Sequence, residues 1–111
     1  TKACDSLASR IEATSSYQEA AEAALALSYV TDPIAVPFLR RALVAGKSVD
    51  LVAIKGLEQI ANRAAVDALI EALELGKGDT QTIARSALLR IRSQTADVVI
   101  KQQIDRVIGQ P

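Results

Sequence analysis

The chain has 111 residues, of which 50% are hydrophobic and 3% aromatic, and its formal net charge is zero. This length predicts a single domain, residues 1–111, whose core is built from alanine and aliphatic side chains. A balanced charge excludes a global attraction to nucleic acid or to an anionic membrane. The sequence also lacks histidine, and with it the commonest general base and metal ligand.

Cys4 is the single cysteine of the chain, so an internal disulfide bond is excluded. A lone thiol fits a reducing compartment. No apolar run reaches the roughly 18 residues of a membrane span, and no signal-peptide pattern is present. We therefore expect a cytoplasmic protein without a membrane partner.

Helical periodicity of the apolar residues runs along the whole sequence and predicts seven helices. The expected helices cover residues 2–13, 17–30, 33–45, 49–61, 64–75, 81–92 and 96–108. Ser16 followed by Glu19 is a capping-box pattern and predicts the start of the second helix. Asp32 can cap the third helix, where Pro33 suits the first helical position. Pro37 lies in or beside the first turn of the same helix, where its missing N–H costs nothing.

The later helix boundaries carry their own signals. Gly46 is expected to close the third helix in a left-handed cap, and Ser48 to cap the fourth. Asp79 or Thr80 is expected to cap the sixth helix, and Gly109 to end the seventh. No segment alternates with period two for long enough to predict a strand.

The apolar pattern repeats about every thirty residues. Positions of like character that are thirty residues apart are Ala23 and Ala53, Leu27 and Leu57, Val30 and Ile60, Val36 and Val66, Leu39 and Leu69, Leu43 and Leu73, and Gly46 and Gly76. A fainter third copy contains Ala84, Leu88, Ile91, then Val98 or Val99, Ile104 and Gly109. Self-similarity at this period predicts a stacked solenoid. The expected units are an N-terminal capping helix, residues 1–16, and three repeats, residues 17–47, 48–79 and 80–111.

Small residues recur at one equivalent position, Ala26, Gly56 and Ala87. Glycine within a helix costs about 1 kcal/mol relative to alanine, so Gly56 indicates a packing constraint. We expect these residues to let the two helices of a pair approach closely. Leu57 and Leu69 are expected to be buried between neighbouring pairs.

The two clearest copies resemble the HEAT-like repeat, in the short bacterial form found in phycobilisome lyase-type proteins. The resemblance rests on Ala23, Ala26-Leu27, Val30, Asp32-Pro33, Ala35-Val36, Leu39 and Leu43, and on Ala53, Gly56-Leu57, Ile60, Ala65-Val66, Leu69 and Leu73. It covers residues 17–111 and implies an all-α right-handed superhelix of antiparallel helix pairs. Ala61-Asn62 stands where such repeats often have Gly-Asp.

The residues indicate no catalytic chemistry. One cysteine cannot make a zinc site, and residues 76–79 contain glycine and lysine without the strand and spacing of a phosphate cradle. Glu71 and Glu74 fit a solvated helix face better than an acid–base pair. No aromatic residue interleaves with Arg85, Arg90 and Arg92 for base stacking. We therefore expect a protein without enzymatic activity, cofactor, metal or nucleic-acid partner.

The sequence predicts a non-catalytic scaffold that binds another protein on the concave face formed by the second helices. The candidate partner-binding residues are Phe38, Arg40, Arg41, Asp67, Glu71, Glu74 and Lys101. An alternative, implied by the resemblance, is a bilin-lyase-type subunit or chaperone that holds a phycobiliprotein or its tetrapyrrole. Phe38 with Arg40 and Arg41 would then contact the tetrapyrrole.

The charges allow two further expectations. Arg41, Glu71 and then Lys101 or Gln102 follow one another at the repeat spacing, and two interpretations stay open: a ladder of ion pairs between repeats, or the rim of a partner-binding surface. Residues 1–32 carry five acidic and two basic side chains, whereas residues 80–111 carry five basic and two acidic ones. Complementary ends predict weak head-to-tail contact at low salt and a monomer at ordinary salt.

Overall fold

The computed structural model describes residues 2–45, 49–76 and 78–109, and within these ranges the chain is helical without a strand. The elements are α1 (Lys2–Ala13), α2 (Tyr17–Ser28), the 3-10 turn η1 (Pro33–Ala35), α3 (Val36–Val44), α4 (Asp50–Ile60), α5 (Arg63–Leu75), α6 (Asp79–Gln94) and α7 (Val98–Ile108). The all-α prediction is confirmed. None of these helices is long and apolar enough to cross a lipid bilayer.

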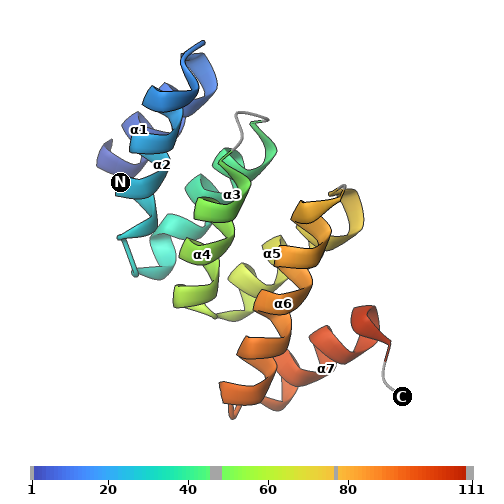
Figure 1. Cartoon of the computed structure of the whole chain (residues 1–111). Coiled ribbons are helices and arrows are strands. Elements are labelled where there is room, and N and C mark those ends of the chain that lie inside the picture. The colour runs from blue at the N-terminus through green and yellow to red at the C-terminus, as the bar shows by residue number, and fades with distance from the viewer. Residues whose placement is uncertain (1, 46–48, 77, 110–111) are drawn as a thin grey trace.

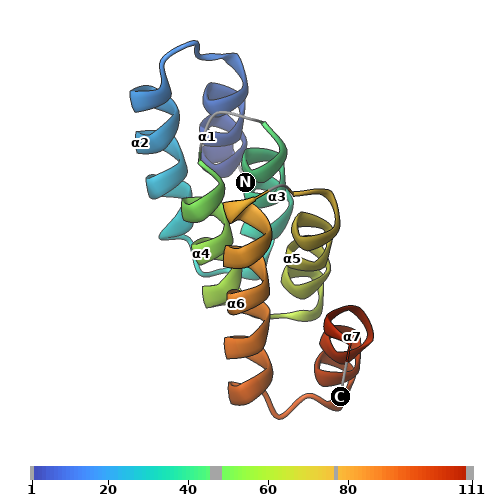
Figure 2. The same cartoon turned by 45° about the vertical axis from the view of Figure 1, so that its right-hand side comes forward.

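The helices form two layers (Figures 1 and 2). One layer contains α2, α4 and α6, each in contact with the next, and the other contains α1, α3, α5 and α7 in the same manner. Each of α1, α3 and α5 packs chiefly against the helix that follows it in the chain. In its packing, α1 therefore corresponds to α3 and α5, which are the second helices of the expected repeats.

The core follows the thirty-residue register. Leu27, Leu57 and Leu88 are fully buried in one layer, and Leu39 and Leu69 are fully buried in the other. The expected burial of Leu57 and Leu69 is thereby confirmed. Alanines at the helix crossings complete the core and allow the two layers to pack with few aromatic side chains.

The last helix departs from the expected register. Val98 and Val99 are exposed, and Ile100 takes the buried position in their place, whereas Ile104 is buried as expected. The expectation that Val98 or Val99 continues the apolar pattern is wrong. The reason is the loop before α7, where Asp97 accepts hydrogen bonds from the N–H groups of Val99 and Ile100 and starts the helix at Val98.

Side chains at two helix starts act almost as expected. Ser16 Oγ accepts from the N–H of Glu19 at 3.3 Å, but the Glu19 carboxylate accepts from the Thr14 hydroxyl at 2.8 Å and does not return to Ser16. Thr14 Oγ1 accepts the Ser16 N–H at 3.1 Å. Asp32 accepts from the N–H of Ile34 at 3.0 Å, although it caps the short turn η1 and not an α-helix.

The expected cap of α6 is wrong. Asp79 is itself the first residue of the helix, and Gly78, at a φ of +55°, precedes it without a side-chain cap. This left-handed backbone favours glycine and lets the helix begin two residues earlier than expected. The Thr80 hydroxyl instead donates to the Asp50 carboxylate at 2.6 Å and joins α6 to α4.

The remaining capping expectations have different outcomes. Gly109 ends α7 at a φ of +76°, and its N–H donates to the carbonyl of Asp105, as expected. The predicted caps at Gly46 and Ser48 lie outside the described residues.

Gly56 marks a close helix approach in the core. A Cβ atom at this position would lie 2.9 Å from Leu39 Cδ2 and 3.1 Å from Ser28 Cα. The small residue therefore serves contact with α2 and α3 of the preceding repeat, and the expectation of close approach within its own pair is wrong. Ala87 is buried like Gly56, whereas Ala26 is exposed because no helix precedes α2 in its layer.

In the described part of the chain, charged side chains cover the side of α2 that has no neighbouring helix in its layer. Val49 is buried and Val52 half-buried where α4 meets α2. Thirty residues earlier, the equivalent positions on α2 are Glu19 and Glu22, and both side chains are exposed. Charged residues at a terminal repeat keep the open end of a solenoid soluble.

Candidate functional site

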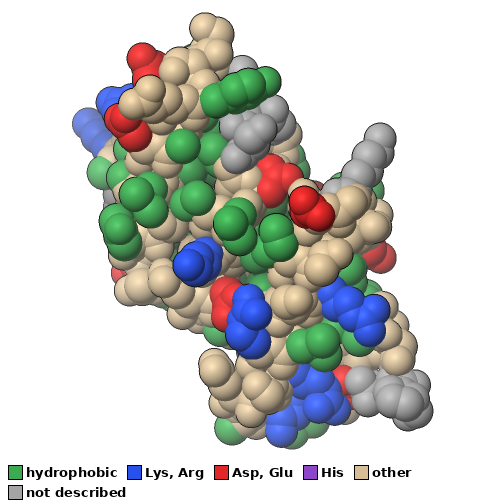
Figure 3. All heavy atoms as spheres, viewed as in Figure 1, with side chains coloured by type: hydrophobic (Ala, Val, Ile, Leu, Met, Phe, Trp, Pro, Cys, Tyr) green, Lys and Arg blue, Asp and Glu red, His purple; other side chains and the backbone are tan. Residues whose placement is uncertain are grey.

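The face formed by α2 and α4 carries a cluster of exposed apolar side chains. Leu25, Tyr29 and Leu51 have exposed fractions of 47%, 72% and 55%. They surround a groove of about 270 Å³ between the two helices. The residues that line this α2/α4 groove are Leu25, Ser28, Tyr29, Leu51, Val52, Lys55 and Gln59. Figure 3 shows hydrophobic side chains gathered over α2 and α4 on this face.

Helical spacing places these side chains side by side. Leu25 and Tyr29 are four residues apart at the end of α2, and Leu51 and Lys55 have the same spacing on α4, so each pair shares one helix face. Gly56 brings α4 close to the backbone of Ser28, which closes the floor of the groove.

The chemistry of the α2/α4 groove is apolar with a single cation. Ser28 is buried, and its hydroxyl donates to the carbonyl of Leu25 at 2.7 Å, so it offers no free donor to a ligand. Lys55 is the one charged residue among those that line the groove. Among the described residues, no group of three or more histidine, cysteine, aspartate or glutamate side chains could hold a metal ion. The groove is therefore suited to a ligand whose apolar side chains contact the two helices and whose neighbouring carboxylate reaches Lys55.

The partner-binding residues predicted from the sequence lie on the other layer, and several bind each other. The guanidinium of Arg40 in α3 donates three hydrogen bonds of 2.7 to 3.0 Å to the carboxylate of Glu71 in α5. The expected ion pair between Arg41 and Glu71 is therefore wrong, because Glu71 binds the neighbouring residue Arg40. Lys101 is half-exposed on α7 and forms no ion pair within the described ranges.

Arg41 turns toward α1. Its guanidinium donates to Glu12 at 2.6 Å and to Asp5 at 2.9 Å, and it lies 5.9 Å from the centre of the half-buried Phe38 ring. The hydrogen bonds to Glu12 and Asp5 raise the pKa of Arg41 above its usual range. The same contact lowers the pKa of Glu12 below its ordinary value. This cluster joins α1 to α3 within the layer that both helices share.

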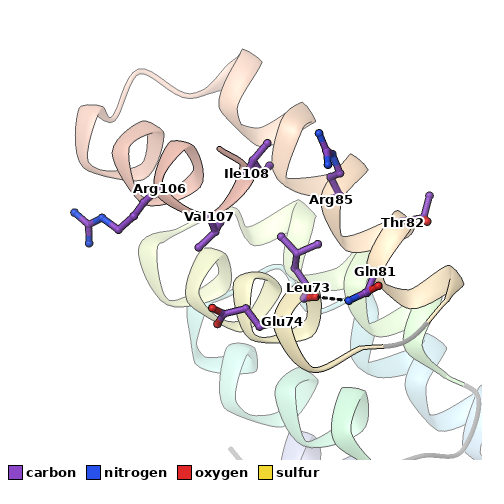
Figure 4. Close-up of a pocket in the computed structure, with 8 residues that line it drawn as sticks. All are labelled: Leu73, Glu74, Gln81, Thr82, Arg85, Arg106, Val107 and Ile108. Carbon is purple, nitrogen blue, oxygen red and sulfur yellow. Dashed lines mark hydrogen bonds between the residues drawn. The ribbon is translucent and has the colours of Figure 1, made fainter. Parts of the chain in front are cut away.

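The other two predicted residues, Asp67 and Glu74, lie on α5. Asp67 of α5 accepts a hydrogen bond of 2.6 Å from the Gln103 side chain of α7. Glu74 lines a wide depression of about 660 Å³ between α5, α6 and α7. Figure 4 shows that the Arg85 and Arg106 side chains at this depression point in different directions. They do not converge on a common ligand position.

The α2/α4 groove was missed by the sequence analysis. The periodicity assigns Leu27 and Ala23 correctly to the core, and it leaves Leu25, Tyr29 and Leu51 on the opposite faces of their helices. Three large apolar side chains outside the core stripe were the available signal. The thirty-residue register would have placed α2 beside α4 and so brought these side chains together.

The arrangement defines a short two-layer α-solenoid. The family model "PBS lyase HEAT-like repeat" matches residues 20–45 and 51–74. These segments lie over the consecutive helices α2–α3 and α4–α5, and over them the predicted resemblance to HEAT-like repeats is confirmed. Comparisons with curated proteins and with solved structures gave no match.

Proposed function

We propose that this chain is a non-catalytic scaffold that binds a partner protein in the α2/α4 groove. The observation that carries the proposal is the cluster of Leu25, Tyr29 and Leu51 around the groove. Contiguous apolar surface on a soluble protein marks an interaction site, and tyrosine is enriched among the residues that dominate binding energy.

The opposite layer supports this choice of face. Arg40 and Arg41 already bind carboxylates of neighbouring helices, so a partner would have to replace those contacts. Their arrangement favours a role in helix stacking. The partner-binding role predicted for the face of α3 and α5, here called the α3/α5 face, remains a prediction. The experiment below also tests this face, through a crosslinker at position 67.

The name of the matched family mentions a lyase, and a lyase-type subunit is the second candidate. Such a subunit could hold a protein substrate in the same groove. The sequence contains no histidine, which supports a holding role over a catalytic one. A tetrapyrrole at Phe38 would compete for Arg40 and Arg41 with Glu71 and Glu12. The scaffold is therefore the better supported function.

Site-specific photo-crosslinking in the source cells tests the proposal. A crosslinking amino acid at position 51 is expected to trap a discrete partner protein, and excess unlabelled protein should compete for it. The Leu51→Glu protein should fail to compete, whereas the matched variant Leu75→Glu, at a residue with 71% exposure on α5, should compete normally. A partner trapped from position 67 and not from position 51 would transfer the function to the α3/α5 face.

A further inference from the structure

We infer that the element bound in the α2/α4 groove is an amphipathic helix with acidic residues beside its apolar stripe. This inference rests on the proposed function and specifies the chemistry of the partner. It follows from the shape of the groove, its lining, and the charges that surround it.

The groove favours a helix over an extended strand. A strand binds by adding to the open edge of a sheet, where backbone N–H and C=O groups are unpaired. The described residues contain no sheet, and the two walls of the groove are the helices α2 and α4. Apolar side chains spaced three and four residues apart on a partner helix can reach Tyr29, Leu51 and Leu25 together.

The surrounding charge favours acidic residues on that helix. Lys55 lines the groove and forms no ion pair within the described ranges. Figure 3 shows both acidic and further basic side chains on the same face, the basic ones over α6. Of the arginines of α6, Arg90 and Arg92 already bind carboxylates, so Lys55 is the cation that the groove offers to a partner. Glu58 lies near this face but binds Arg90 at 2.7 Å, and Glu22 lines a separate groove between α1 and α2. A carboxylate on the partner beside its apolar stripe would therefore meet Lys55.

Two synthetic peptides of about 15 residues, long enough to populate a helix, provide the test. Both peptides carry the same leucines along one helix face. The polar face of one peptide is rich in glutamate, and that of the other is rich in lysine. Titration followed by NMR is expected to show shifts at Leu25, Leu51 and Lys55 with the acidic peptide. Its Kd should be at least about tenfold lower than that of the basic peptide, and added salt should narrow the difference.

Substitutions on the protein separate charge from apolar contact. Lys55→Glu should abolish the preference for the acidic peptide, whereas Lys2→Glu, at an exposed lysine on α1, should preserve it. Tyr29→Ala should weaken binding of the acidic peptide, and Tyr17→Ala, at a tyrosine with similar exposure, should not. Far-UV circular dichroism of each variant checks that these surface changes leave the fold intact.

Each outcome decides the inference. Equal or tighter binding of the basic peptide in the groove, or no binding of either peptide, would overturn it. The crosslinking experiment at position 51 is independent of the peptides. A partner trapped there without any acidic preference leaves the scaffold function standing and removes only the acidic-helix inference.

Discussion

Arg40 and Arg41 are consecutive residues of α3, yet their guanidinium groups bind carboxylates on opposite sides of that helix. Arg40 binds Glu71 in α5, 31 residues later in the chain. Arg41 binds Glu12, 29 residues earlier, and Asp5, both in α1. Since consecutive side chains on a helix point in different directions, one doublet joins three successive helices of the layer.

This doublet predicts unequal effects of two similar substitutions. Arg41→Gln removes the contacts with Glu12 and Asp5 and loosens the capping helix, whereas Arg40→Gln removes only the pair with Glu71. We expect Arg41→Gln to lower Tm more. Because these charges are solvent-exposed, thermal unfolding in high salt should reduce the difference. Equal Tm values at low salt would contradict this account of how α1 is held.

Core substitutions test the continuity of packing across repeats. Leu57→Ala and Leu69→Ala should each reduce the free energy of unfolding by about 2–5 kcal/mol, because both side chains are fully buried. Gly56→Leu should also destabilise the protein, since even a Cβ atom there would lie 2.9 Å from Leu39. Chemical denaturation provides the measurement, with Lys55→Ala as the exposed control on the same helix. Losses no larger than that of the control would contradict the packing described.

Ala61 offers a stabilising substitution. It ends α4 in the left-handed region, at a φ of +52°, where glycine is ordinarily preferred. Ala61→Gly should raise the free energy of unfolding by about 0.5–1 kcal/mol, because it relieves the steric cost of this backbone at some entropic expense. The control Ala64→Gly lies in the first turns of α5 with ordinary helical geometry and should destabilise the protein. Denaturant titration of both variants distinguishes the two effects.

Asp105 predicts a defined pH response. The hydrogen bond from Arg92 lowers the pKa of Asp105 below its ordinary value of 3.8. A depressed folded-state pKa contributes stability that is present above pH 3.8 and is lost as the pH falls through the folded-state value. Arg92→Gln should raise the pKa of Asp105 toward 3.8. Asp97, whose pKa is lowered by Arg63, should stay unchanged in the same carboxyl NMR titration; parallel shifts of both groups would point to a general structural change.

The two ends of the solenoid predict weak self-association. Exposed Glu19 and Glu22 lie at the α2 end, and Arg85 and Arg106 lie at the α6 and α7 end. Stacking two copies end to end would set α7 beside the next α1 and leave the other layer without a helix between α6 and the next α2. We therefore expect a monomer at ordinary salt and association only at low ionic strength. Sedimentation velocity across a salt series measures this, and a dimer that persists in high salt would indicate an apolar interface.

Local features of the sequence were sufficient to predict most helices and much of the core. The bounds of α1 and the burial of Leu57 follow from apolar periodicity, which acts within one helix and its nearest neighbours. The start of α7 is set by the Asp97 cap, a polar signal that apolar periodicity does not include. The exposure of Ala26 depends on which helices lie alongside, and periodicity carries no such information. Periodicity likewise cannot predict that Glu71 binds Arg40 and not Arg41. Only the relative rotation of α3 and α5 decides between these two arginines.

The α2/α4 groove could not be predicted from amphipathicity alone. The pattern distinguishes core from surface most clearly when the surface is polar, and here the exposed faces of α2 and α4 also carry large apolar side chains. The periodicity leaves Leu25 outside the core stripe, but whether this side chain faces solvent or a neighbouring helix depends on where the other helices lie. The packed structure shows that Leu25, Leu51 and Tyr29 lie on the outer surface of their layer, away from the core between the two layers.

The hydrogen bond between Thr80 and Asp50, which are thirty residues apart, links equivalent positions of successive repeats. Because α4 meets α2 on one side and α6 on the other, a tandem duplication of residues 49–78 would keep the first copy of α4 beside α2 and the second copy beside α6, and the two copies of α4 would meet at a new junction. Glu19 and Glu22 would remain at the far end and keep it soluble. Unequal recombination in the gene could thus lengthen the molecule and add a further inter-helix groove to its face, but a second Asp50 would then take the place of Thr80 opposite Asp50, and this contact would have to change.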